Sequence, residues 1–170
     1  FLIGQPFRLP HLRRALEQLA PRLPVVLIQR PPSYRPKEER TAFRDCSAQL
    51  PGEFRFAVEF RDSGWHQPSI IRLLEKHRVC WVWSDTTPLN ERNLAPFEFQ
   101  PLTTDFLYLR LLGHTVTKYD ADGKRVHRYD KLLWKREAAL DSWALRIQRQ
   151  LDALRNVWTF VNNHYEGFAH

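Results

Sequence analysis

The stretch FRFAVEFRDSGW, residues 54–65, decides how the rest of this chain is interpreted. Apolar residues alternate with charged or small ones over 54–61, which predicts a β-strand, because successive strand side chains point to opposite faces. A turn follows, and then the amphipathic segment Ser69–His77, which predicts a helix. This order favours a βαβ unit whose helices cover the apolar face of the strand. Glu59 and Arg61 then lie at a strand's carboxyl end, where β/α barrels build their sites.

Length and composition set the class of protein. The chain has 170 residues, 43% of them hydrophobic, which fits one globular domain with a core rather than a disordered segment. Its apolar runs are too short to span a membrane and no signal-peptide pattern opens it, so we expect a cytoplasmic protein with no membrane partner. Cys46 and Cys80 lie in apolar segments and are expected to be buried reduced thiols.

Helices and strands are predicted to alternate along the rest of the chain. Further strands are expected at Leu23–Gln29, Val79–Asp85, Asp105–Gly113 and Asn156–Asn163, and helices at Pro10–Ala20, at Lys37–Leu50 and along the apolar stripe from Leu140 to Leu154. A long loop is expected at Thr86–Thr104. Five strands are too few for a closed eight-stranded barrel, so either the sheet is open or strands are missing before Phe1. The chain starts at Phe1 and has no Met, which favours a fragment.

Several segments together resemble one known family. The segments LPVVLIQRPPSY at 23–34, FRFAVEFRDSGW at 54–65, TTDFLYLRLLG at 103–113 and VNNHYEGFA at 161–169 occur in the order found in the YecE-like proteins, the domain of unknown function 72. The resemblance covers about Leu23–Ala169. It implies an α/β fold of the TIM-like β/α-barrel type. Residues 1–170 would then form one partial barrel of about five parallel strands, without its first strands and last helix.

Two positions depart from the family's pattern. Arg30 stands where the family more often has an apolar residue, and Leu112 stands where it commonly has His. The family's activity is not established, so the resemblance implies a fold rather than a reaction. A likeness in shape to metal-dependent phosphodiester-cleaving barrels is an analogy at the level of the fold alone.

Polar and charged residues gather at the predicted carboxyl ends of the strands. We expect Glu59, Asp85 and His164 to act as catalytic groups, and the substrate to be bound by Gln29, Arg61, Trp65, Arg110, Asn162 and Asn163. Guanidinium groups suit phosphate or carboxylate, and carboxylates suit proton transfer or a hard divalent metal. Two alternatives stay open: Glu59 and Arg61 as a buried ion pair that only fixes the barrel, and Trp65 as a packing residue.

These residues support two main hypotheses of function. The first is a hydrolase-type barrel enzyme, assisted by a divalent metal, that acts on a phosphorylated or otherwise anionic substrate such as a phosphodiester. The alternative is a non-catalytic nucleic-acid-binding module, favoured by the net charge of +7, in which Trp65, Tyr119 and Tyr129 stack on bases. A third, structural expectation is that the truncated chain associates with itself through open sheet edges.

Overall fold

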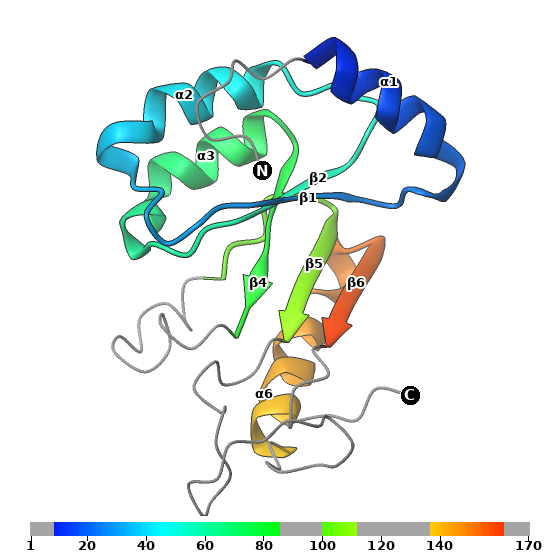
Figure 1. The fold of residues 1–170 in the computed structure, drawn as a ribbon. Coiled ribbons are helices and arrows are strands. Elements are labelled where there is room, and N and C mark those ends of the chain that lie inside the picture. The colour runs from blue at the N-terminus through cyan, green and yellow to red at the C-terminus, as the bar shows by residue number, and fades with distance from the viewer. Residues whose placement is uncertain (1–8, 86–99, 112–136, 162–170) are drawn as a thin grey trace, which may run out of the picture. The chain divides into compact units, whose positions relative to one another are not determined.

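The computed structural model describes residues 9–85, 100–111 and 137–161 (Figure 1). The chain divides into two compact units. The first takes in Phe1–Trp81 and Pro101–Thr104, and the second takes in Val82–Gln100 and Asp105–His170. Each unit holds a three-stranded sheet of its own. The expectation of one domain over residues 1–170 stays a prediction.

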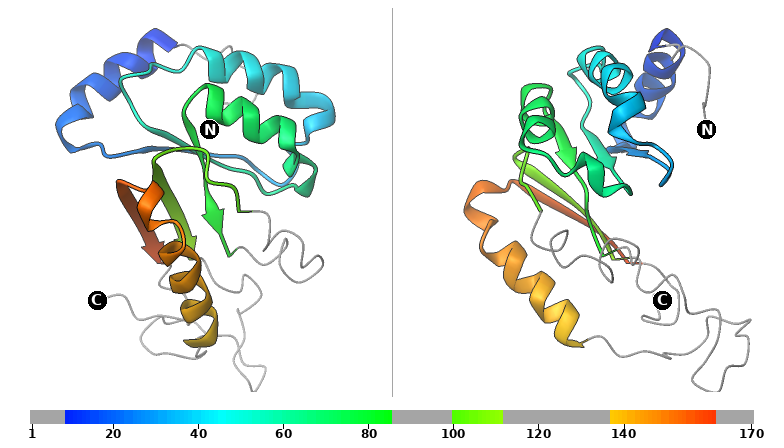
Figure 2. Two further views of the ribbon diagram at one scale, coloured as in Figure 1. Left: turned by 180° about the vertical axis from the view of Figure 1, so that it is seen from behind. Right: turned by 90° about the vertical axis from the view of Figure 1, so that its left-hand side faces the viewer.

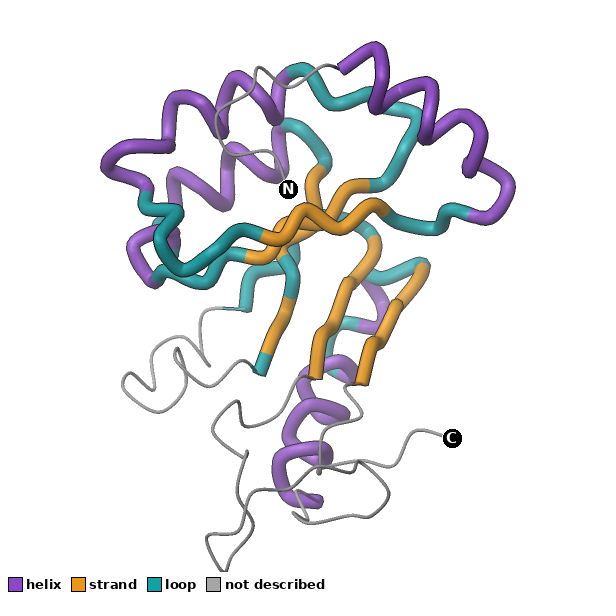
Figure 3. Tube along the Cα trace, viewed as in Figure 1, coloured by secondary structure: helices purple, strands orange, loops and turns teal. Residues whose placement is uncertain are grey.

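All strand pairs among the described residues are parallel, which confirms the predicted α/β class. Figure 3 shows helices and strands alternating along the trace over residues 9–81. The first sheet has the order β1 (Val26–Gln29), β2 (Phe56–Glu59), β3 (Val79–Trp81), and the second has β4 (Trp83–Ser84), β5 (Phe106–Leu111), β6 (Asn156–Val161). The helices are α1 (Leu9–Leu19), α2 (Pro36–Ala48), α3 (Pro68–Lys76) and α6 (Glu137–Gln148), with short 3-10 turns at Ala20–Arg22, Ser63–Trp65 and Leu151–Ala153. These described strands do not close into a barrel.

The prediction of one strand over Val79–Asp85 was wrong, because this segment forms two strands in two sheets. β3 pairs with β2, and β4 pairs with β5. The buried hydroxyl of Thr103 accepts a hydrogen bond from the N–H of Trp81 and donates one to the carbonyl of Val79, both at 2.8 Å. A side chain therefore satisfies the backbone groups that a neighbouring strand would otherwise bind.

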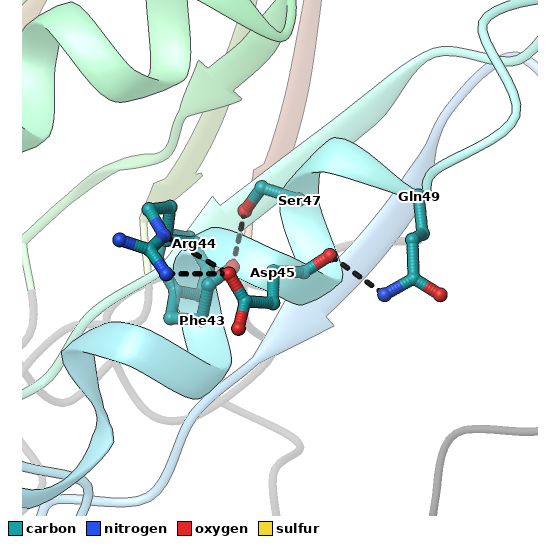
Figure 4. A network of polar contacts seen from close by, with 5 residues as sticks. All are labelled: Phe43, Arg44, Asp45, Ser47 and Gln49. Carbon is teal, nitrogen blue, oxygen red and sulfur yellow. Dashed lines mark hydrogen bonds and ion pairs between the residues drawn. The ribbon is translucent and has the colours of Figure 1, made fainter.

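Helices α1, α2 and α3 lie on one face of the first sheet (Figure 2). Helix α2 begins with Pro36, whose missing N–H costs nothing in the first turn, and Glu38 and Glu39 there complement the helix dipole. Its last turn is held by side-chain bonds: Ser47 donates to the carbonyl of Phe43 at 2.7 Å (Figure 4).

Phe43 and Arg78 mark two features of the first unit, a core contact and a turn. Phe43 of α2 packs edge-on against Phe60, with ring centres 5.1 Å apart, so the apolar face of the 54–61 segment meets a helix as predicted. Arg78 ends the turn after α3 with a positive φ of 53°, a conformation that favours glycine. Cys80 is buried and Cys46 is half-buried, and neither forms a disulfide.

Helix α6 covers one face of the second sheet (Figure 2). Trp143 is its buried residue, and its ring centre lies 6.3 Å from that of Trp83 in β4. The predicted apolar stripe is buried only in part: Leu140 is 47% exposed and Leu151, beyond the end of the helix, is 52% exposed. Among the described segments, no helix combines the length and the apolar character that a membrane crossing requires.

Candidate functional site

Glu59 ends the central strand of the first sheet, and the structure buries it almost completely. Its exposed fraction is 1%. In the parallel register Glu59 is the partner of Gln29, the last residue of β1, which is exposed. The N–H of Arg30 donates to the backbone carbonyl of Glu59 at 3.1 Å. The two strand ends predicted to carry site residues therefore lie side by side.

Arg61 is the partner of this buried carboxylate. Its Nε lies 3.4 Å from Glu59 Oε1, and 30% of the Arg61 side chain is exposed. A guanidinium offers five N–H donors, so one ion pair leaves donors for a ligand. The pair thus combines a buried carboxylate with a partly accessible guanidinium, and this arrangement is suited to binding an anion.

Trp65 was predicted as a substrate-binding residue, and the structure shows a packing residue instead. Its exposed fraction is 0%. Both faces of the indole are covered, by Tyr34 with ring centres at 5.1 Å and by Phe60 at 4.6 Å, each nearly parallel. Its Nε1–H donates to the carbonyl of Tyr34 at 2.7 Å. A ring enclosed in this way has no face on which a ligand could stack.

Arg30 was not among the predicted site residues, although the sequence already marked it as a departure from the family's pattern. Its guanidinium carbon lies 3.8 Å from the ring centre of Tyr34, a cation–π contact. Burial raises the pKa of Tyr34, and the Arg30 guanidinium opposes that shift. Burial also raises the pKa of the nearby Cys46 thiol. Arg30 therefore extends the stack of Tyr34, Trp65 and Phe60 and contributes to packing.

His66 follows Trp65 and lies against the same aromatic cluster. Its ring meets that of Trp81 edge-on, with centres 5.2 Å apart. Burial lowers the pKa of His66, and the Asp62 carboxylate opposes that shift. Asp62 itself caps the turn at 63–65 by accepting the N–H of Gly64 at 2.9 Å. The neutral form of this imidazole is therefore favoured in the folded protein.

The second unit carries the other described candidates at the ends of its strands. Asp85 is 4% exposed, and its N–H donates to the carbonyl of Arg110 at 3.2 Å. Arg110 lies in β5 and is half-buried. Asn162, Asn163 and His164 lie outside the described residues, as do His114, Tyr119 and Tyr129. The structure thus pairs Gln29 with Glu59 and Arg61 in one unit, and Asp85 with Arg110 in the other.

A metal centre finds no support in the described part of the chain. Within residues 9–85, 100–111 and 137–161, no three His, Cys, Asp or Glu side chains lie close enough together to hold an ion. A hollow of about 380 Å³ at the start of α2 is lined by Ser33, Arg35, Glu38 and Glu39. Its two carboxylates make it unsuited to an anion, and its Arg35 pairs with Asp62, the residue after Arg61, at 3.6 Å.

Comparisons with known proteins place this geometry in a family. The model of the family described as "Protein of unknown function DUF72" matches residues 7–170. A DUF72 family protein of Thermotoga maritima is similar in structure, with a TM-score of 0.68 and 25% identity over 94% of this chain and 59% of that one. A DUF72 family protein of Enterococcus faecalis has a TM-score of 0.62 and 18% identity over 88% of this chain and 59% of that one. The chain thus spans about three-fifths of these relatives. No curated protein matches it.

Proposed function

Because this chain belongs to the DUF72 family, whose description assigns no activity, we propose a function from its own side chains: it binds a small anionic ligand at the carboxyl ends of its parallel strands. The observation that carries this proposal is the pair of Glu59 and Arg61 at the end of β2. A buried carboxylate that fixes a partly exposed guanidinium prepares that guanidinium for phosphate or carboxylate.

We further propose that the ligand is a substrate, with a phosphodiester as the chemical class, and that the reaction is hydrolysis. In this scheme Arg61 binds the anionic oxygens and Glu59 holds Arg61 in place. Glu59 accepts a proton from the water that attacks phosphorus and returns it to the leaving alcohol oxygen as the bond from that oxygen to phosphorus breaks. Asp85 and Arg110 carry the same two kinds of group at the strand ends of the second unit. The divalent metal expected from the sequence stays a prediction: within residues 9–85, 100–111 and 137–161 no group of three His, Cys, Asp or Glu side chains could hold it, so we assign no metal ligand.

The TIM-like barrel that the sequence resemblance implies is part of the same proposal. Its support is that all described strand pairs are parallel and that helices alternate with strands. Parallel strands joined by helices place their carboxyl ends, and hence their functional side chains, at one edge of a sheet.

The test measures the thermal unfolding midpoint with inorganic phosphate. We expect phosphate to raise the midpoint of the natural chain, because a ligand that binds only the folded state stabilises it. Arg61→Gln should abolish the rise and Arg61→Lys should keep part of it. Arg44→Gln is the matched control, since it removes one exposed positive charge that pairs with its neighbour Asp45. An equal loss in Arg44→Gln and Arg61→Gln would refute a site at Arg61.

Hydrolysis of bis(p-nitrophenyl) phosphate tests the reaction itself. Hydrolysis that persists in Glu59→Gln would refute the role of Glu59 in proton transfer.

A nucleic-acid-binding module is the alternative proposal, and the net charge of +7 supports it. Trp65 cannot stack on bases, because its ring is buried. Binding of this kind should weaken steeply as the salt concentration rises. A response to nucleic acid that is indifferent to salt would remove this alternative.

A further inference from the structure

One row of partnered residues crosses the second sheet near the carboxyl ends of its strands. Ser84 of β4 is the partner of Arg110 of β5, and Arg110 is the partner of Phe160 of β6. Partnered residues of a parallel sheet point to the same face, so these three side chains share one face. Residues two positions earlier share it too, and they include Tyr108 and its partner Trp158.

This face is the one opposite helix α6. Trp83 packs on Trp143 of α6, and the partner of Trp83 in β5 is Leu109, whose side chain points away from that of Arg110. The second sheet therefore has one face, with Trp83 and Leu109, toward its described helix, and an aromatic face with Tyr108, Trp158 and Phe160 on the other side. Phe106 and Trp158 meet edge-on within the aromatic face, with ring centres 5.5 Å apart.

On the aromatic face, exposure increases toward the edge strand β6, where Phe160 and Asn156, the partner of Phe106, are both exposed. Tyr108 is 7% exposed, whereas Phe160 is 47% exposed and Arg110 is half-buried. The Phe160 ring lies nearly parallel to that of Tyr108, at 17° and 4.7 Å between ring centres. Tyr108 thus covers one side of the Phe160 ring and holds it in place, which leaves an exposed aromatic surface in the same row as Arg110.

We propose that this row binds a small ligand that combines a planar ring with an anionic group, of which a nucleoside monophosphate is the simplest. The base stacks on Phe160, and the phosphate binds the guanidinium of Arg110. Neighbouring strands lie about 4.8 Å apart, and the long Arg side chain extends that span to the separation of a base from its phosphate. The net charge of +7 complements the ligand's negative charge.

The inference rests on the proposed function in one respect: both assign an anion to a strand-end arginine. It goes further because it adds a planar ring, stacked on Phe160, to the anionic group of the ligand. Stacking on an aromatic side chain does not depend on the identity of the base, so several nucleoside monophosphates should bind with similar affinity. Loss of ring recognition with phosphate recognition intact would therefore separate the two proposals.

The experiment measures by calorimetry the affinity of the chain for adenosine monophosphate, for inorganic phosphate and for adenosine. We expect the monophosphate to bind at least about tenfold tighter than phosphate, in line with the contribution of one stacked base. Phe160→Leu should lower the affinity for the monophosphate about fivefold or more and leave the affinity for phosphate unchanged. Phe160→Tyr should keep the affinity for the monophosphate. Arg110→Gln should weaken both ligands. Val161→Ala, at an exposed neighbour on the opposite face, is the control.

The outcomes separate the two proposals. A monophosphate that binds no tighter than phosphate, or whose affinity survives Phe160→Leu, overturns the inference. Phosphate binding that depends on Arg61 alone overturns it as well but supports the proposed function. Monophosphate binding that depends on Phe160 and Arg110 supports the inference even if Arg61→Gln has no effect. Binding of a single-stranded oligonucleotide without any binding of the monophosphate overturns the small ligand in favour of the nucleic-acid module.

Discussion

The two units bury their apolar residues to very different extents. In the first, every residue of β2 and β3 is buried. In the second, the edge strand β6 is exposed at five of its six positions, and the large exposed apolar side chains, Leu19 apart, all belong to this unit. An apolar strand sequence therefore indicates which side chains can be buried. Whether they are buried depends on the elements that pack against the strand. We expect packing energy to be concentrated in the first unit and ligand access in the second.

The largest expected effect comes from removing the central ring of the first unit. Trp65→Ala leaves a cavity among Tyr34, Phe43 and Phe60 and should lower the free energy of unfolding by about 3–5 kcal/mol. Trp65→Phe should cost less, because it keeps a ring between Tyr34 and Phe60. Urea unfolding followed by circular dichroism measures both.

The matched substitution in the second unit is Phe160→Ala, which removes an aromatic ring that is 47% exposed. It should cost about 1 kcal/mol or less, because only part of the ring area is taken from water on folding. A cost for Phe160→Ala equal to that of Trp65→Ala would break the contrast between the two units.

An effect between those of Trp65→Ala and Phe160→Ala is expected at Thr103, whose hydroxyl binds the backbone of β3 at the end of the first sheet. Thr103→Val keeps the shape of the side chain and removes the hydroxyl that bonds to Val79 and Trp81. It leaves buried backbone groups without partners and should cost about 1–3 kcal/mol. Thr103→Ser keeps the hydroxyl and should cost less. If the valine and serine variants unfold at the same urea concentration, the hydrogen bonds of Thr103 contribute nothing to the stability of β3.

Sequence periodicity predicted the order of helices and strands because each depends on residues close together along the chain. The split between β3 and β4 could not be predicted, since it depends on Thr103, 22 residues beyond Trp81. The burial of Trp65 depends on Tyr34, 31 residues before it. The pairing of Glu59 with Arg61 was foreseeable from a spacing of two in one strand segment. The row of Arg110 and Phe160 was not, because it depends on the register between β5 and β6.

A smaller contribution again is expected from His66, and it appears only on acidification. The pKa of His66 is lowered in the folded protein, so the unfolded chain takes up the proton first as pH falls below the ordinary value of about 6.5. Stability should therefore decrease between that pH and the lower folded pKa and not change further through this group. His66→Gln should flatten this part of the unfolding midpoint plotted against pH, whereas His77→Gln serves as the control for loss of an imidazole. An unchanged slope in His66→Gln would show that the burial of this ring does not affect its titration.

The smallest effect is expected at the surface of the second unit. Arg155 Nε lies 3.2 Å from Asp105 Oδ2, but the two side chains are 82% and 59% exposed. Exposed ion pairs contribute about 0.2–1 kcal/mol and are screened by salt, so Arg155→Gln should change the free energy of unfolding by less than about 1 kcal/mol. The backbone N–H of Arg155 still donates to the carbonyl of Asp105 at 2.7 Å, so the link at the start of β5 and β6 survives the substitution. A double-mutant cycle with Asp105→Asn measures the pair, and a coupling as large as the Trp65→Ala loss would mean that charges, rather than packing, hold this unit together.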